Sequence, residues 1–117
     1  MITIKETKSK IISDPKWWKI AFFDWVDDFR RCKSPSAIAE PFELGDDQMD
    51  SLLASTIEFL CDELELVVPD WVGQIPACRK PYFVSGIENL KATAIVESPA
   101  HFRARKIFVT ESFLTRV

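Results

Sequence analysis

The sequence is poor in the residues that most catalytic and nucleotide-binding motifs require. It contains one histidine, His101, and three glycines, Gly45, Gly73 and Gly86. A nucleophile–base pair needs a Ser, Cys or Thr oriented by a histidine, and the solitary His101 argues against such a pair. A phosphate-binding loop needs clustered glycines, and these three are scattered. We therefore expect a protein that is not an enzyme and that binds no cofactor.

Cysteine is also scarce, with only Cys32, Cys61 and Cys78. An odd number without close pair spacing suggests neither a disulfide framework nor a zinc ribbon, so we expect reduced and mostly buried thiols. Glu58 and Asp62 are four residues apart on a predicted helix, but no histidine is near them. Like charges at this spacing usually lie on a solvated helix face, so we expect no metal site.

No apolar run approaches the roughly 20 residues that cross a bilayer, and the N-terminal stretch MITIKETKSK lacks the apolar core of a signal peptide. With 117 residues, 47% of them hydrophobic, the chain has the composition of one soluble domain. These features predict a cytoplasmic protein without a membrane partner.

Lysine and arginine are absent from residues 40–70, which carry ten acids. The flanks are basic: residues 1–39 have eight Lys or Arg against five acids, and residues 71–117 have seven against three. The acidic middle argues against a nucleic-acid footprint there. The basic flanks either bind phosphate or pair with the acidic segment inside the fold, and we favour the internal pairing.

The apolar spacing predicts an all-α, compact single-domain bundle of three main helices plus short helical turns. One helix spans 14–31, where the spacing from Trp18 to Phe29 marks a buried face, and a second spans 46–66. The third, residues 87–97, is apolar on both sides and is expected to be central. We expect residues 1–13 to form an N-terminal arm, either loose or a short strand, and residues 14–117 to form the helical domain.

The first helix has more apolar bulk than its buried face uses. Trp17, Ile20 and Phe23 lie away from the core stripe, beside charged neighbours. Because small proteins rarely leave such bulk in water, these three residues are candidates for contact with another protein. The alternative is that the helix is covered on both sides and all three belong to the core.

Arg103, Arg105 and Lys106 form a basic cluster near Phe102 and Phe108. Cationic and aromatic side chains in this pattern resemble a phosphate-binding and base-stacking surface, which would make the chain a DNA-binding regulator. The alternative is that the arginines form ion pairs within the fold.

Several segments resemble a bacterial family of small proteins. They are WVDDFRR at 25–31, PDWV at 69–72, KPYFV at 80–84 and LKATAIVESPAHFRARKIFV at 90–109. The family's C-terminal motif reads approximately L-x-A-x-A-L-V-E-S-P-x-x-F-R-x-R-N-I-F-V, after P-x-W and P-W-F elements, and the likeness covers roughly residues 17–117.

The resemblance implies an antitoxin-like protein that binds and restrains a partner enzyme. Members of the family are described as helix-turn-helix regulators or lie beside a nucleotidyltransferase in toxin–antitoxin pairs. Relatives that bind DNA carry an additional N-terminal helix-turn-helix unit, which the 13 residues before the first predicted helix do not supply. The resemblance therefore favours a protein partner, a nucleotidyltransferase-type toxin, over DNA, and a homo-oligomer stays open.

Overall fold

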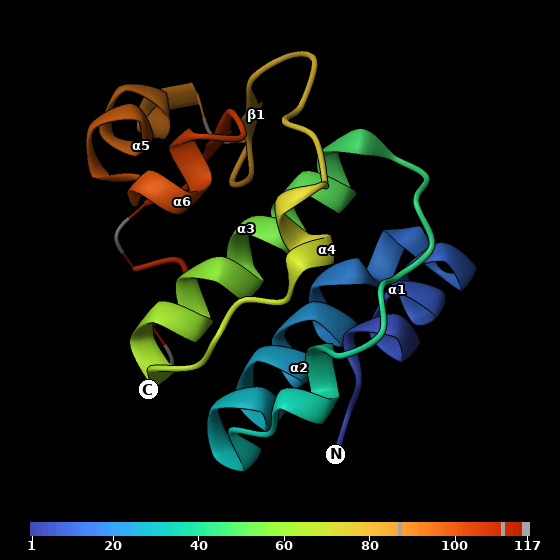
Figure 1. Cartoon of the computed structure of the whole chain (residues 1–117). Coiled ribbons are helices and arrows are strands. Elements are labelled where there is room, and N and C mark those ends of the chain that lie inside the picture. The colour runs from blue at the N-terminus through green and yellow to red at the C-terminus, as the bar shows by residue number, and fades with distance from the viewer. Residues whose placement is uncertain (87, 111, 116–117) are drawn as a thin grey trace.

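The computed structural model of the chain describes residues 1–86, 88–110 and 112–115 and is mostly helical, as predicted (Figure 1). A small parallel sheet is the only sheet within these residues; in it Tyr82 is in register with Ile107. The α-helices and strands are α1 (Ile4–Ser13), α2 (Trp18–Cys32), α3 (Asp47–Leu64), α4 (Asp70–Gly73), β1 (Tyr82–Phe83), α5 (Lys91–Glu97), α6 (Ala100–Arg103) and β2 (Ile107–Phe108). Short 3₁₀ helices span Pro15–Trp17, Pro35–Ile38 and Glu88–Leu90.

Helix α2 has the predicted buried face. Phe22, Trp25, Val26 and Phe29 are fully buried, and the rings of Trp25 and Phe29 stack with centroids 5.1 Å apart. The helix ends at Lys33, which adopts a left-handed conformation with φ of 51°. The apolar spacing thus predicted both the helix and most of its core residues.

Helix α3 is the central element, and it runs between α1 and α2 on one side and the C-terminal segment on the other (Figure 1). Its N-terminus is capped by Asp46, whose side chain accepts a hydrogen bond from the Gln48 N–H at 3.3 Å. Polar side chains in the first half of α3, those of Asp50, Ser51 and Ser55, are buried. Because α3 is covered on both sides, its small polar residues are enclosed together with its apolar ones.

Residues 4–13 form helix α1, not the loose arm or short strand expected from the sequence. Thr3 and Glu6 make a capping box, in which each side chain accepts a hydrogen bond from the other residue's backbone N–H. Ile4 and Ile11 lie seven residues apart on the same face and are buried, together with the intervening Thr7 and Lys8. A helix face with only two aliphatic residues has a weak apolar signal, which explains the error.

The predicted third main helix is shorter and less central than expected. Helix α5 covers only Lys91–Glu97, and Ala94 is its one buried residue, whereas Val96 is 78% exposed. Ile87, the predicted start, lies outside the described residues. Ser98 does not cap the following helix; its hydroxyl oxygen accepts a hydrogen bond from the Val109 N–H at 2.8 Å, which ties α5 to the segment after β2.

Candidate interaction surface

Trp17 and Ile20 form an exposed apolar surface at the start of α2. Trp17 ends the 3₁₀ turn Pro15–Trp17, and Ile20 follows three residues later, so both project from one side of the helix. Trp17 is 54% exposed and Ile20 is 59% exposed. The Lys16 ammonium lies 5.4 Å from the centre of the Trp17 ring. These two side chains therefore lie outside the core, as the partner-contact hypothesis requires.

Phe23, the third residue predicted for this surface, is half-buried. Its ring lies edge-on against Phe22 and Phe113, with centroid distances of 5.0 and 5.6 Å. It also lines a shallow hollow with Lys19, Ile20 and Asp24. Phe23 therefore lies at the edge of the core, and only part of its ring is exposed beside Trp17 and Ile20.

An apolar groove of about 510 Å³ lies next to this surface. Its lining comes from separate segments of the chain and includes Ile11, Ile12, Pro15, Trp18, Leu44, Met49 and Tyr82. Ile12 is 49% exposed and Leu44 is 60% exposed. Sequence reasoning missed the groove because it depends on the packing of the unpredicted helix α1 against the loop before α3.

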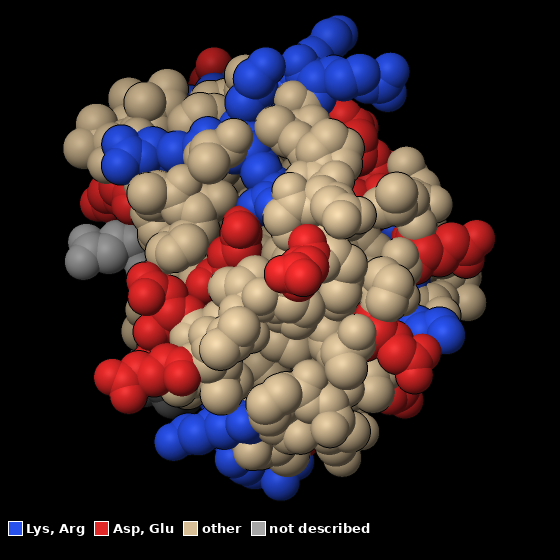
Figure 2. Space-filling view, viewed as in Figure 1, with Lys and Arg blue, Asp and Glu red and all other residues tan. Residues whose placement is uncertain are grey.

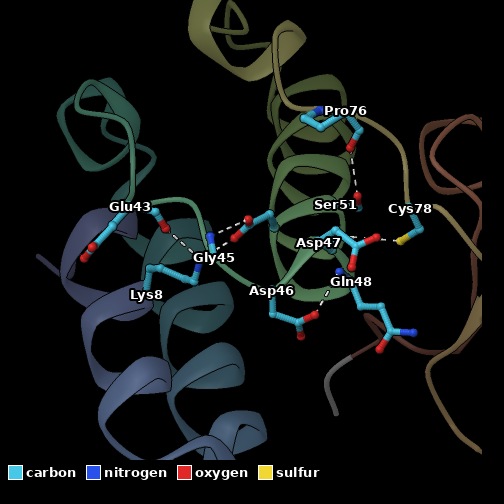
Figure 3. A network of polar contacts seen from close by, with 10 residues as sticks. Lys8, Glu43, Gly45, Asp46, Asp47, Gln48, Ser51, Pro76 and Cys78 are labelled. Atoms are coloured by element: carbon cyan, nitrogen blue, oxygen red, sulfur yellow. Dashed lines mark hydrogen bonds and ion pairs between the residues drawn. The ribbon is translucent and has the colours of Figure 1, made fainter.

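A buried ion pair between Lys8 and Asp50 holds that loop in place (Figure 3). The Lys8 ammonium also donates a hydrogen bond to the Glu43 carbonyl at 2.7 Å and lies 4.9 Å from the centre of the Phe42 ring. The second carboxylate oxygen of Asp50 accepts a hydrogen bond from the Gly45 N–H at 2.8 Å. One lysine from α1 and one aspartate from α3 thus clamp residues 42–45 beside the groove.

The first turn of α3 also anchors the segment that leads to β1 (Figure 3). The Ser51 hydroxyl donates to the Pro76 carbonyl at 2.8 Å, and the Asp47 carboxylate accepts from the Arg79 N–H at 3.0 Å. The Arg79 backbone hydrogen bond is the main cause that lowers the pKa of Asp47. Burial, and next the charge of Asp46, raise the pKa of Tyr82.

Arg105 is buried, which corrects its predicted place in a surface basic cluster. Its guanidinium forms an ion pair with Glu58 of α3 and donates to the carbonyls of Val72, at 2.9 Å, and Ile75, at 3.1 Å. A guanidinium has several donors in a fixed planar fork, so it can join three segments at once. Arg103 and Lys106 are exposed. The predicted cluster is therefore divided between the interior and the surface.

The charges on the face seen in Figure 2 are unevenly distributed. Lys and Arg gather over the loop before β1, at the top of the view, where Arg79 and Lys80 are exposed. Asp and Glu gather toward the C-terminal end of α3, where Asp62, Glu63 and Glu65 are exposed. The acidic segment predicted from the sequence is thus partly a surface and partly, through Asp50 and Glu58, a set of internal ion-pair partners.

Within the described parts of the chain, no three His, Cys, Asp or Glu residues come together as a candidate metal site. The His101 ring lies edge-on against Phe59, at 5.8 Å, and its Nε2 is 3.5 Å from a carboxylate oxygen of Asp62. All three cysteines are free thiols, and Cys61 and Cys78 are buried, as predicted. Burial, helped by the charge of Glu58, raises the pKa of Cys61 to about 11.

None of the helices in residues 1–86, 88–110 and 112–115 has the length and apolar character needed to span a membrane. Comparisons with protein-family models, curated proteins and solved structures gave no significant match to this chain. The likeness to the antitoxin-like family therefore stays a prediction.

Proposed function

We propose that the chain is a non-catalytic protein-binding module that holds its partner through the exposed start of α2. The exposure of Trp17 and Ile20 is the observation that carries this proposal. Contiguous apolar surface of this kind commonly marks a protein interface, and tryptophan is enriched among the residues that dominate binding energy.

The fold itself gives no reason for these two side chains to be apolar. The face of α2 that supports the core is complete without them, because Phe22, Trp25, Val26 and Phe29 are already fully buried. Covering a large apolar side chain contributes about 1.5–3 kcal/mol. A partner that covered both Trp17 and Ile20 would gain a substantial part of the free energy of a stable complex.

The partner class follows from the family resemblance. An antitoxin-like protein restrains an enzyme, and the resemblance names a nucleotidyltransferase-type toxin as that enzyme. Binding alone is sufficient for this role, since restraint requires only that the module cover the enzyme's site or fix an inactive conformation. We therefore propose a complex in which this chain contributes contact surface and no catalytic group.

Purification of the tagged chain from its native host tests this function. We expect a stoichiometric protein partner to copurify with the wild-type chain and to be lost from the Trp17→Asp/Ile20→Asp double variant. Val67→Asp is the matched control, because Val67 is an exposed apolar residue on the segment after α3. Recovery of no partner, or equal recovery by the double variant and the control, would contradict the proposal.

A DNA-binding regulator is the second candidate, and one observation favours it. The Tyr82 N–H donates to the Lys106 carbonyl at 2.8 Å, so the segment that carries Arg79 and Lys80 lies beside the exposed Lys106. We propose these three residues and Arg103 as its phosphate contacts, without Arg105. A salt-dependent shift of the chain's own promoter DNA, abolished by Arg103→Glu/Lys106→Glu, would establish this function in place of the first.

A further inference from the structure

The groove between α1 and the loop before α3 combines an apolar lining with an acidic rim. Glu43 and Asp46 line it, and both are exposed. The Asp46 carboxylate accepts a hydrogen bond from the Gln48 N–H, and Lys8 contacts the backbone carbonyl of Glu43, not its carboxylate. Among the described residues, no lysine or arginine forms an ion pair with either carboxylate.

Lys8 also lines the groove, but its charge is already neutralised. Its ammonium is held by Asp50, by the Glu43 carbonyl and by the face of Phe42, and the side chain is 2% exposed. The net charge offered to an occupant is therefore negative, because two carboxylates face solvent without a cation. A bound segment that carries a cation would gain from both carboxylates, whereas an acidic segment would be repelled.

We propose that this groove binds a short apolar segment of the partner polypeptide that carries lysine or arginine. This inference rests on the proposed protein-binding function and adds the chemistry of the partner. Cavities of roughly 300–1,000 Å³ bury most of a ligand with the bulk of a few side chains, and the groove has about 510 Å³. Ile12 from α1 and Leu44 from the loop present their exposed apolar atoms to that segment.

The groove and the Trp17 surface share one short piece of backbone. Pro15 and Trp18 line the groove, and the exposed Trp17, which lies between them in the chain, is not part of its lining. A single partner can therefore contact both, with its main body on Trp17 and Ile20 and a segment in the groove. The contact at Trp17 and Ile20 depends on buried apolar area, whereas the contact in the groove depends on charge as well.

Selection from a phage-displayed library of random 12-residue peptides tests the inference directly. The library is selected on the full-length wild-type chain, and the recovered peptides are then assayed on Leu44→Gln, which removes apolar surface without adding charge, with Val67→Gln as a control that should still bind them. We expect the recovered peptides to be rich in apolar residues and in Lys or Arg, to be poor in Asp and Glu, and to bind Leu44→Gln at least tenfold more weakly than wild type.

A charge reversal sharpens the test. Glu43→Lys is chosen because the Glu43 carboxylate forms no ion pair with a lysine or arginine among the described residues, whereas Asp46 caps α3. We expect Glu43→Lys to bind the selected basic peptides at least fivefold more weakly and to recover acidic peptides when the library is selected on it. Urea unfolding of each variant verifies that the fold is retained.

Three outcomes would overturn the inference. Recovered peptides without a basic bias would show that the groove does not select for charge, and peptides that bind Leu44→Gln as well as wild type would show that the groove is not the site. Recovery of no peptide would also overturn the inference, and a concentration-dependent dimer that Leu44→Gln disrupts would then assign the groove to a second copy of the chain. None of these results tests the proposed function, which fails if no partner copurifies with the wild-type chain or if the Trp17→Asp/Ile20→Asp variant keeps its partner.

Discussion

The two sides of helix α2 carry similar residues in opposite surroundings. Trp25 and Phe29 on one side are fully buried in the core, whereas Trp17 and Ile20 on the other side are more than half exposed. Apolar character alone therefore does not decide burial here. The buried side supports the fold, whereas the exposed side does not, and the proposed partner surface would account for its apolar character.

Truncation of the two tryptophans should separate these roles most strongly. We expect Trp25→Ala to lower the free energy of unfolding by about 3–5 kcal/mol, because it removes a fully buried aromatic side chain and leaves a cavity. We expect Trp17→Ala to change it by no more than about 0.5 kcal/mol, as for most surface substitutions. Urea denaturation measures both, and comparable losses would show that Trp17 supports the core.

Two arginines that are two positions apart, Arg103 at the end of α6 and Arg105 in the turn after it, give the next comparison. Arg105→Ala removes the partner of Glu58 and takes one hydrogen-bond donor from each of two backbone carbonyls, so we expect a loss of about 3 kcal/mol. Arg103→Ala, at an exposed position, should cost no more than about 0.5 kcal/mol. A stable Arg105→Ala variant with weakened DNA binding would instead return Arg105 to the surface cluster.

The carboxyl group of Asp28, on another side of α2, leads us to expect that the stability of the fold depends on pH. The backbone N–H of Ile2 donates to Asp28 at 2.7 Å, and this hydrogen bond, aided by Arg31, lowers the pKa of Asp28 below its ordinary value of 3.8. A carboxyl with a lowered folded-state pKa contributes stability above 3.8 that is lost as the pH falls through the folded-state value.

Asp28→Asn should therefore be less stable than wild type at neutral pH and should approach it below pH 3.8. Thermal unfolding measured between pH 7 and pH 2.5 tests this expectation. Glu6→Gln, which keeps a capping side chain on the exposed first turn of α1, is the control for a general effect of acid. A constant difference between Asp28→Asn and wild type across the range would contradict the assignment.

The smallest expected effect is on the rate at which the cysteine thiols react with a disulfide reagent. With a pKa of about 11, the buried Cys61 is almost entirely protonated at pH 8, so a disulfide reagent should not modify it in the folded chain. Cys78 is also buried, whereas Cys32 is half-exposed. One fast-reacting thiol is expected, absent from Cys32→Ser, with the other two appearing on unfolding. Three thiols that react equally fast would contradict the burial of Cys61 and Cys78.

The sequence predicted the helices in which apolar residues recur every three or four positions. The buried face of α2 and the helix predicted over 46–66, which corresponds to α3, could both be recognised, because they rest on spacing within one helix. Helix α1 could have been found from Thr3 and Glu6, whose spacing is that of a capping box, although its apolar face is sparse. The exposure of Val96 on α5 could not be predicted, since it depends on which distant segments of the chain pack beside α5.

The features of the candidate surface also differ in how far the sequence could predict them. The exposure of Trp17 and Ile20 agrees with a sequence argument that needed only the phase of one helix. The groove and the burial of Arg105 depend on contacts between residues far apart in the chain, such as Lys8 with Asp50 and Arg105 with Glu58. No local pattern distinguishes an arginine that binds phosphate from one that pairs with an acid inside the fold.

Hydroxyl-radical footprinting of the free chain and of the complex copurified from the native host tests the central claim most directly. We expect Trp17 and Ile20 to be oxidised readily in the free chain and to be protected at least fivefold in the complex, while Val67 reacts equally in both. Equal oxidation of Trp17 in the free and bound chain would contradict the claim that the exposed side of α2 is held for another protein.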